Sequence, residues 1–394
     1  MKKALLFSLG SGVEERLRLF RDSLSSDYEV EIYISDFNHT NKSYVTHFED
    51  DLQYIHVPSY SSNLSFSRIN SYLKFGDAVK KILSKKKPDL IYVMLPPNNV
   101  AAKCLGYLKE RNAFFILDIY DLWPESLPLD RIKFKFNPIY SYWKNMRDKS
   151  IKRADYIFTE CDLYREKLNY ILEGRENIST LYLEKKMKDS ELDEVRKQID
   201  LYSQNFTVES NCIKLAYLGS INFIIDTPRI SQIVGQLVSR GKQVQVHIIG
   251  TGEGLALFRK ELNLSGAEVV YHGKIFDTNQ KIELLSQCDF ALNLMVDSVN
   301  VGLTTKSIDY FSMGLPLLNS IKGDTWNFVN NSGVGINDSE LIVEKIIEAM
   351  SHKEHMIELH RNAFLIYKEK FTPEKFKEVV IRVLKEAGVL HDNN

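Results

Sequence analysis

The chain has 394 residues, 44% of them hydrophobic, which is enough for two domains with cores of ordinary size. Its 51 lysines and arginines nearly balance 52 aspartates and glutamates, which excludes a global positive field for nucleic acid, and its four cysteines show no CxxC pair or metal-ligand spacing. Because the sequence has no signal-peptide core and no apolar run of about 20 residues, we expect a cytoplasmic protein with reduced thiols.

The first half of the chain alternates strand-like apolar runs with amphipathic helical segments. The runs include KALLFSL, EVEIYIS, DLIYVMLP and FFILDIY. Short apolar runs separated by helices are typical of parallel strands that are covered on both faces. We therefore predict an N-terminal, Rossmann-like domain over residues 1–185.

The same rhythm begins again after a polar stretch rich in lysine and glutamate, residues 186–212, which we predict to be a linker. The later runs include IKLAYLG, VQVHIIG, AEVVYHG and DFALNLM. They predict a second Rossmann-like domain over residues 213–371. A capping threonine followed by proline and glutamate begins a last helix, 372–394, which we expect to pack back toward the N-terminal domain.

Ligands of open α/β sheets bind beyond the carboxyl ends of the strands, so the candidate residues are those that follow strands. Gly10, Ser11 and Gly12 follow the first predicted strand and resemble the start of a dinucleotide fingerprint. The third glycine of that fingerprint would fall at Glu15, next to Glu14, and two carboxylates would repel a pyrophosphate. The segment is either a tight turn or a loop that faces a neutral acceptor sugar.

The segment LDIYDLWPESLPLD packs acids, a tryptophan and prolines directly after a strand. Carboxylates accept hydrogen bonds from sugar hydroxyls, and an indole face stacks on the apolar edges of a sugar ring. Trp123 and Glu125 could therefore bind a sugar. Alternatively, Trp123 belongs to the core and Glu125 helps to cap a helix that begins at Pro124.

Several segments together resemble the bacterial family 4 glycosyltransferases that build O-antigen and capsule repeat units. DIYDLWPESL is similar to the family's DLWPES segment, and Lys306 and Asp309 occupy the lysine and glutamate positions of its K-x-x-E-Y-x-x-x-G-x-P motif. VHIIGTGEG and YHGKIFD resemble the family's iiGdGpe and fhGrvpd segments. The resemblance implies the α/β GT-B fold, in which two Rossmann-like doubly wound domains face each other across an interdomain cleft. It also implies an acceptor-binding N-terminal domain (residues 1–185), a nucleotide-sugar donor held by the C-terminal domain (residues 213–371), and no bound metal.

The donor is expected at the carboxyl edge of the second predicted sheet. No D-x-D pair occurs in the sequence, so the protein itself must neutralise the diphosphate. Gly302 to Thr305 lie where a helix would begin, and their amides, the positive helix end and Lys306 could stabilise the leaving group. The donor-binding candidates are Gly219, Ser220, Asn222, Arg229, Gly250, Gly252, Lys274, Gly302, Leu303, Thr304, Thr305, Lys306 and Asp309.

Asp309 lies three residues after Lys306, on the same face of the predicted helix. One interpretation is a surface pair between these two side chains. The resemblance implies instead that Asp309 replaces the family's second glutamate, which binds the ribose hydroxyls of the nucleotide.

The chain departs from the family pattern at three places. Val301 stands where the family has the acid that commonly contacts the transferred sugar. Ser220 and Asn222 stand near the usual arginine and lysine of a diphosphate clamp, with Arg229 as the nearest cation. Tyr120 coincides with the family's histidine. The donor sugar and the stereochemical course are therefore open.

Retaining members of the family have no evident enzyme nucleophile, so the acceptor hydroxyl is the remaining target for catalysis. Asp121 could orient or deprotonate that hydroxyl, with Glu125 as the alternative, and both could instead bind sugar hydroxyls. The catalytic candidates are thus Asp121 and Lys306. The acceptor-binding candidates are Gly10, Ser11, Gly12, Tyr120, Trp123 and Glu125.

The stretch from Arg131 to Arg153 carries eight basic residues and one acid, interleaved with aromatic and aliphatic residues. Such a segment suits an anionic membrane surface, although part of it must be the core-facing side of a helix. An acceptor on a lipid pyrophosphate would give membrane contact a purpose. We expect no binding of nucleic acid.

The resemblance, together with these residues, implies a metal-independent, retaining hexosyltransferase without a cofactor. It would move a sugar from a nucleoside diphosphate, with UDP favoured, to a lipid-linked or growing glycan of a capsule, O-antigen or lipopolysaccharide, in the cytoplasm or at the inner face of the membrane. Two alternatives remain. One is a nicotinamide-dependent oxidoreductase or epimerase, and the other is a degenerate GT-B subunit that binds glycan without turnover.

Overall fold

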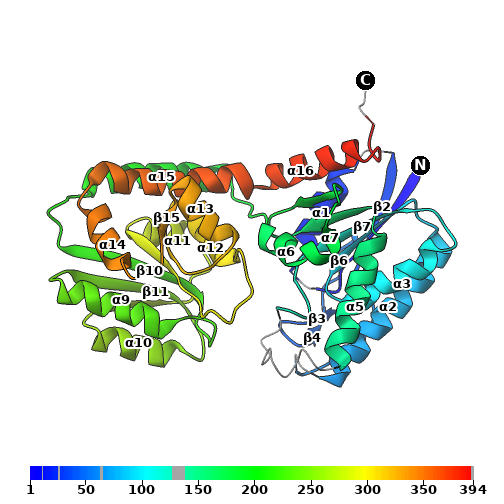
Figure 1. The fold of residues 1–394 in the computed structure, drawn as a ribbon, viewed down its shortest axis with the longest axis horizontal. Helices are drawn as coiled ribbons and strands as arrows, with labels where there is room; N and C mark the ends of the chain where they lie inside the picture. Colours follow the sequence, from blue (N-terminus) through cyan, green and yellow to red (C-terminus); the bar gives the residue numbers. More distant parts are fainter. Residues whose placement is uncertain (11, 25–26, 63–64, 127–137, 392–394) are drawn as a thin grey trace. The chain divides into compact units, whose positions relative to one another are not determined.

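The computed structural model describes residues 1–10, 12–24, 27–62, 65–126 and 138–391. The chain forms two compact units, which we call unit 1 (Met1–Tyr182 with Glu374–Asn394) and unit 2 (Leu183–Pro373). Each unit is built on one parallel sheet with helices on both faces (Figure 1). No helix in the described ranges is long and apolar enough to span a membrane.

The sheet of unit 1 has seven strands in the order β5-β2-β1-β6-β7-β8-β9. The central strand β6 is buried at every position, as expected for a parallel strand covered on both faces. The strands are β1 (Lys2–Phe7), β2 (Tyr28–Ser35), β5 (Leu52–Ile55), β6 (Leu90–Leu95), β7 (Phe114–Ile119), β8 (Tyr156–Thr159) and β9 (Ile178–Thr180), and a hairpin of β3 (Phe37–Asn38) and β4 (Ser43–Tyr44) follows β2.

The last helix of the chain packs in the core of unit 1. Its residues Phe376 and Val380 share that core with Leu17 and Phe20 of α1. A buried ion pair between Arg16 and Asp118, 2.7 Å long, lies beneath the Phe376 ring. The helices of unit 1 are α1 (Glu14–Ser23), α2 (Phe66–Lys86), α3 (Asn98–Leu108), α5 (Pro138–Arg153), α6 (Asp162–Lys167), α7 (Asn169–Leu172) and α16 (Pro373–Glu386).

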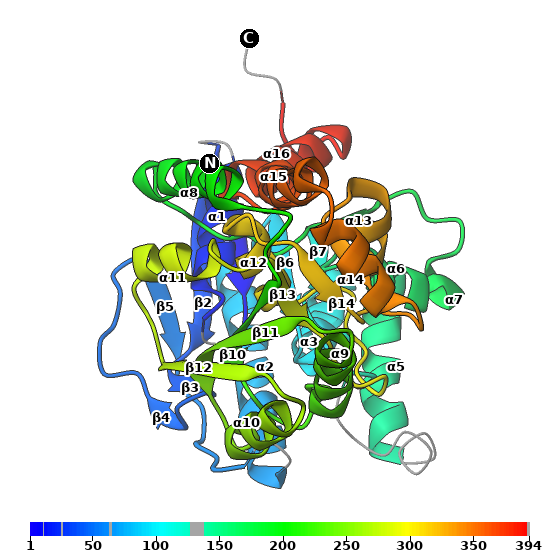
Figure 2. The same ribbon diagram turned by 90° about the vertical axis from the view of Figure 1, so that its left-hand side faces the viewer.

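The sheet of unit 2 has six parallel strands in the order β12-β11-β10-β13-β14-β15. Figure 2 labels the strands from β10 to β14. The strands are β10 (Cys212–Ser220), β11 (Gln243–Thr251), β12 (Glu268–Gly273), β13 (Phe290–Asn293), β14 (Leu317–Asn319) and β15 (Gly335–Asn337). The helices are α8 (Asp189–Asn205), α9 (Thr227–Ser239), α10 (Leu255–Leu264), α11 (Thr278–Leu285), α12 (Thr305–Ser312), α13 (Asp324–Ser332), α14 (Ile342–Met350) and α15 (Lys353–Lys370).

The predicted linker, residues 186–212, contains helix α8. Val195, Ile199 and Tyr202 recur at helical spacing and are buried within unit 2, where α8 packs on α11 and α15. The polar composition of this stretch concealed the narrow apolar stripe, because one buried residue per turn, at every third or fourth position, is enough to hold an otherwise solvated helix.

Candidate functional site

The carboxyl edge of the unit 2 sheet is built around two paired glycines. Gly219 at the end of β10 lies opposite Gly250 at the end of β11, and both have positive φ values, +115° and +141°. A Cβ on Gly250 would lie 1.9 Å from the carbonyl oxygen of Gly219, and one on Gly219 would lie 3.1 Å from Cδ of Lys306. The missing side chains therefore let two strand ends and Lys306 approach one another closely.

Lys306 lies in the first turn of α12, at the same edge. Its Nζ donates to the Tyr217 hydroxyl at 3.2 Å and lies 4.9 Å from the centre of that ring. Burial lowers the pKa of Lys306 to about 8, and among the described residues no carboxylate forms an ion pair with it. A bound anion would favour the charged ammonium.

The start of α12 is fixed by hydrogen bonds on both sides. Thr304 is the N-cap, and its hydroxyl accepts from the Ser307 amide at 3.1 Å. The carbonyl of Gly302 accepts from the amide and the hydroxyl of Thr325. Leu303 is buried, whereas Thr305 is exposed, so the side chains of these four candidates have different environments.

Three asparagines, which sequence reasoning missed, connect the neighbouring strand ends to α12. Asn293, Asn319 and Asn337 are the last residues of β13, β14 and β15. The side-chain amide of Asn293 donates to Asn319 at 2.9 Å and to the Ser307 hydroxyl at 3.1 Å, and that of Asn319 donates to Asn337 at 2.8 Å. The signal was partly present in the sequence, since two apolar runs end in asparagine, at 319 and 337, and Asn293 interrupts a third, DFALNLM.

Asp309 pairs with Lys185 and not with Lys306. The Lys185 Nζ lies 2.6 Å from the Asp309 carboxylate. The backbone of Lys185 is itself held, because its amide donates to Phe371 and its carbonyl accepts from the Tyr367 hydroxyl at 2.8 Å. Lys185 stands 124 residues before Asp309, so no local pattern could have identified this partner.

The other donor candidates have varied surroundings. Arg229 forms an ion pair with Asp338 at 2.6 Å, so its guanidinium is already bound to a carboxylate. The Asn222 side chain accepts from the Ile224 amide within a turn. A Cβ on Gly252 would lie 2.0 Å from the Ile221 carbonyl oxygen. Ser220, the last residue of β10, and Lys274, which follows β12, are exposed. The structure therefore brings together Gly219, Gly250, Lys306 and the start of α12.

At the carboxyl edge of the unit 1 sheet, Glu125 is bound by a buried arginine. Its two carboxylate oxygens accept from Arg147 at 2.5 and 2.9 Å, and Arg147 also donates to the Trp123 carbonyl. The Trp123 ring lies 4.6 Å from the guanidinium of Arg68. Glu125 thus has a structural partner, and Trp123 is held between charged and aromatic neighbours.

Asp121 and Tyr120 follow β7 directly. The Tyr164 hydroxyl lies 3.5 Å from the Asp121 carboxylate, and burial raises the pKa of Asp121. A carboxylate with a raised pKa is suited to accepting a proton. The ring of Tyr120 packs against the unit 1 core and lies 5.7 Å from the Arg16 guanidinium.

In the loop after β1, the amides of two glycines donate hydrogen bonds to side chains of nearby residues. The amide of Gly12 donates to the Glu14 carboxylate at 2.7 Å, and that of Gly10 to the Ser8 hydroxyl. A pyrophosphate would compete with Glu14 for this position, which argues against a dinucleotide fingerprint. Ser11 lies outside the described residues, and so does the part of the basic segment from 131 to 137.

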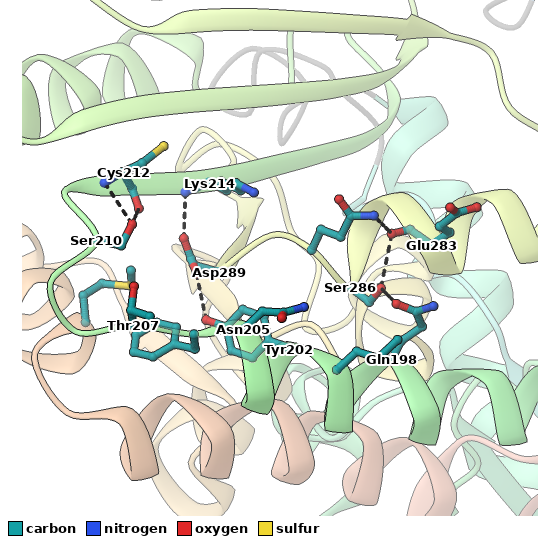
Figure 3. A pocket seen from close by; sticks show the side chains of 14 residues that line it. Gln198, Tyr202, Asn205, Thr207, Ser210, Cys212, Lys214, Glu283, Ser286 and Asp289 are labelled. Atoms are coloured by element: carbon teal, nitrogen blue, oxygen red, sulfur yellow. Dashed lines mark hydrogen bonds between the residues drawn. The ribbon is translucent and has the colours of Figure 1, made fainter.

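A second region of unit 2 is hollowed, at the amino edge of the sheet. A pocket of about 420 Å³ lies beside the starts of β10 and β13 (Figure 3). Its buried Asp289 accepts from the Tyr202 hydroxyl and the Lys214 amide, both at 2.7 Å. Burial raises the pKa of Asp289 to about 6. None of the residues predicted from sequence lines this pocket.

Solved structures resemble the chain over almost its entire length. Sucrose-phosphate synthase from Thermosynechococcus elongatus superposes with a TM-score of 0.64 at 14% identity, covering 98% of this chain and 99% of that one. Anabaena HepE in complex with UDP and glucose superposes with a TM-score of 0.60 at 14% identity, covering 98% of this chain and 99% of that one. WaaG, a glycosyltransferase involved in lipopolysaccharide biosynthesis, superposes with a TM-score of 0.58 at 12% identity, covering 96% of this chain and 99% of that one.

These likenesses confirm the fold predicted from the sequence. The chain is an α/β protein with the GT-B fold of these glycosyltransferases, and each of its two parallel sheets belongs to a Rossmann-like, doubly wound unit. No family model and no curated protein matches the sequence.

Proposed function

We propose that the protein is a glycosyltransferase that takes its sugar from a UDP-sugar bound at the carboxyl edge of unit 2. The observation that carries the proposal is Lys306, a partly buried cation in the first turn of α12, beside the glycine pair. Helix starts and lysines both bind phosphate, and a diphosphate would supply the negative charge that this edge favours. HepE, which shares the fold, was solved with UDP and glucose, and this supports UDP as the nucleotide.

Each residue of the proposed donor site has a distinct role. The amides from Gly302 to Thr305 and the Lys306 ammonium hold the diphosphate and stabilise it as it leaves. Asp309, positioned by Lys185, accepts hydrogen bonds from the ribose hydroxyls. Val301 leaves the pocket for the transferred sugar without the usual acid.

On the acceptor side, Asp121 takes the proton of the attacking hydroxyl. The bond between the anomeric carbon and the diphosphate oxygen breaks, the bond to the acceptor oxygen forms, and UDP carries away the electron pair. We propose retention of configuration and no metal, because Lys306 and the helix start provide the positive charge that a divalent ion supplies elsewhere. Glu125 supports Trp123 through Arg147.

The proposed acceptor is a lipid-linked or growing glycan of a bacterial surface polysaccharide, at the cytoplasmic face of the membrane. The DLWPES segment and the fold shared with WaaG support this choice. Helix α5 adds a surface suited to anionic lipid, since Tyr142 is 63% exposed and Lys149, Lys152 and Arg153, two to three turns further along the helix, are exposed as well. Flotation with anionic vesicles should weaken as salt is added.

Calorimetry of the whole chain with UDP, GDP, dTDP and NAD tests the proposal. We expect UDP to bind most tightly and Lys306→Ala to weaken that binding. Binding of NAD without UDP would overturn the proposal.

A degenerate subunit that binds a nucleotide sugar without turnover is the second candidate. Val301 favours it, because the acid that would contact the sugar is missing. UDP-sugar binding with neither hydrolysis nor transfer to any glycan would select this candidate over the enzyme.

A further inference from the structure

Two histidines meet on one face of the unit 2 sheet. His247 lies in the middle of β11, and His272 lies near the end of the neighbouring strand β12. The Nδ1 atom of His247 is 3.0 Å from the Nε2 atom of His272, and the two rings are nearly parallel, with centres 5.2 Å apart. Both side chains are partly buried. We call these two residues the histidine pair.

The regular pairing of β11 with β12 is interrupted at His272. Ile248 pairs with Tyr271 and Ile249 pairs with Gly273, so His272 is the extra residue of a β-bulge. Bulges re-aim side chains and are over-represented next to functional sites. The interruption falls on a member of the histidine pair, which makes the pair a candidate for a ligand site.

Gln245 fixes which nitrogen of His247 carries the proton. The Oε1 atom of Gln245 lies 2.8 Å from the Nε2 atom of His247, and because an amide oxygen only accepts, Nε2 is the hydrogen-bond donor. The lone pair of His247 is therefore on Nδ1, the nitrogen that faces His272. Histidines that bind metal ions typically donate their other N–H to such an oxygen, which sets the tautomer and orients the ring.

Both rings are mostly neutral at pH 7. Burial, with smaller contributions from His272 and Lys214, lowers the pKa of His247 to about 4, and burial also lowers the pKa of His272. Neutral imidazole is the form that binds a metal ion. The exposed carboxylate of Glu268 on β12 would attract a cation to this face, whereas the Lys214 ammonium would repel it.

The distance between the two facing nitrogens suits neighbouring positions around one metal ion. Metal–nitrogen bonds of about 2.0 Å to atoms 3.0 Å apart enclose an angle of about 97°. This is near the right angle of a square-planar or octahedral ion and below the tetrahedral angle of zinc. Sites of that shape with nitrogen and oxygen ligands favour Cu²⁺ and Ni²⁺. Rotation of the rings about their Cβ–Cγ bonds would turn both lone pairs toward the ion.

We propose that the histidine pair binds a divalent transition-metal ion, Cu²⁺ or Ni²⁺, through Nδ1 of His247 and Nε2 of His272. Without the ion, His272 donates its Nε2 proton to His247. When the ion binds, this proton moves to Nδ1 of His272, so no net proton is released. Water fills the remaining positions, because no set of three or more histidine, cysteine, aspartate or glutamate side chains in the described ranges could hold a metal.

The inference goes beyond the proposed function, since the ion has no part in sugar transfer. His247 precedes Gly250 by three residues, about 10 Å along the strand, which separates it from the glycine pair at the carboxyl edge. Strand β12 is the edge of the sheet and pairs only with β11. The ion would therefore join the edge strand to its neighbour and stabilise the folded chain.

Calorimetry of the whole, untagged chain with Ni²⁺ tests the site. We expect one ion per chain with a Kd below about 100 µM. His247→Gln and His272→Gln should each weaken binding about 100-fold, and Gln245→Leu, which leaves both ligands in place, about tenfold. His355→Gln, a change of an exposed histidine on α15, is the matched control and should bind Ni²⁺ as the natural chain does.

Two further readouts separate coordination from a structural role of the rings. Electron paramagnetic resonance of the chain loaded with Cu²⁺ should show coupling to two imidazole nitrogens, and to one in each histidine variant. Free Ni²⁺ at about 100 times the Kd should raise the unfolding temperature by about 5 °C. The rise should be absent from the two histidine variants, and the same scans show whether each variant is folded.

Equal Ni²⁺ binding by the natural chain and a folded histidine variant overturns the inference. A loss in His355→Gln as large as in His247→Gln also overturns it, because the ion would then lie on α15. A Kd above about 100 µM, or coupling of Cu²⁺ to a single imidazole in the natural chain, indicates an adventitious ion only and rejects the site. If one histidine variant does not fold, the other decides.

Discussion

Each unit presents its candidate residues at the carboxyl edge of its own parallel sheet. The two edges differ in whether backbone atoms or side chains form them. In unit 2 the edge is mostly backbone, formed by Gly219, Gly250 and the start of α12, with Lys306 as its cation. In unit 1 it is mostly side chain, with Arg147 on Glu125 and Arg68 on Trp123. A backbone site suits a group common to many ligands, such as a diphosphate, whereas a side-chain site can change with the acceptor.

The largest expected effect is on the unit 1 edge. Asp121→Asn should lower the turnover number about 100- to 10,000-fold, the range for loss of a general base, with little change in UDP affinity. Glu125→Gln is the matched control. Because it loosens Arg147, it should reduce the unfolding temperature and leave most of the turnover. Single-turnover rates of the two variants at saturating UDP-sugar test this difference. An equal loss of turnover in Asp121→Asn and Glu125→Gln would contradict the proposal that only Asp121 acts as the base.

On the unit 2 edge, Lys306→Ala should lower turnover about 100- to 1,000-fold, as for other groups that stabilise a developing negative charge. UDP affinity should fall less. With a pKa of about 8 in the unliganded protein, the ammonium is lost as pH rises, so UDP affinity should decline above pH 8. Lys260→Ala, an exposed lysine on α10, should change neither quantity. A pH-independent affinity would show that Lys306 does not face the diphosphate.

A backbone-built edge should be sensitive to a single methyl group. Gly250→Ala should reduce the free energy of unfolding by about 3 kcal/mol or more, because strain from the positive φ adds to a clash with the Gly219 carbonyl. Gly241→Ala shares the positive φ but meets no atom within 4 Å, so it should cost only about 1 kcal/mol. Urea unfolding of the two variants gives the difference, and equal costs would contradict the close approach.

Asp309→Ala should weaken UDP binding by about 1 to 3 kcal/mol if the carboxylate binds the ribose. Lys185→Met removes only the partner of Asp309 in a partly exposed ion pair, so it should weaken UDP binding by less than about 1 kcal/mol. Calorimetry of both variants separates the two roles. An unchanged affinity in Asp309→Ala would end the ribose assignment.

The amino edge of unit 2 should affect stability without affecting the ligand. Burial raises the pKa of Asp289 from 3.8 to about 6, so the folded chain binds this proton more tightly than the unfolded chain does. The resulting stability is present below pH 4 and is lost as pH rises to about 6, with a slope of at most about 1.4 kcal/mol per pH unit. Asp289→Asn should abolish this dependence and leave UDP affinity unchanged, whereas Asp297→Asn, an exposed change, should preserve it. Retention of the slope in Asp289→Asn would assign it to another group.

Much of the site could be predicted because its signals are local. The glycines at 219 and 250 follow apolar runs, and the stretch before Lys306 has the composition of a helix start. The asparagines at 293, 319 and 337 were visible within or at the end of apolar runs, and only their hydrogen bonds to one another show that they form a set. The partners Lys185 and Arg147 were not predictable, because nothing near Asp309 or Glu125 in the sequence indicates them.

The sequence by itself determined the two parallel sheets and the order of strands and helices along the chain. Strands buried on both faces require continuous apolar runs, and the helices between them require apolar residues at helical spacing on one face. The tertiary structure decided how the charged groups pair. It assigned Arg229 to Asp338, Asp309 to Lys185 and Arg68 to an aromatic environment, since each of these contacts joins side chains far apart in sequence. An ion pair depends on distance and burial in space, and neither quantity is written in the local pattern.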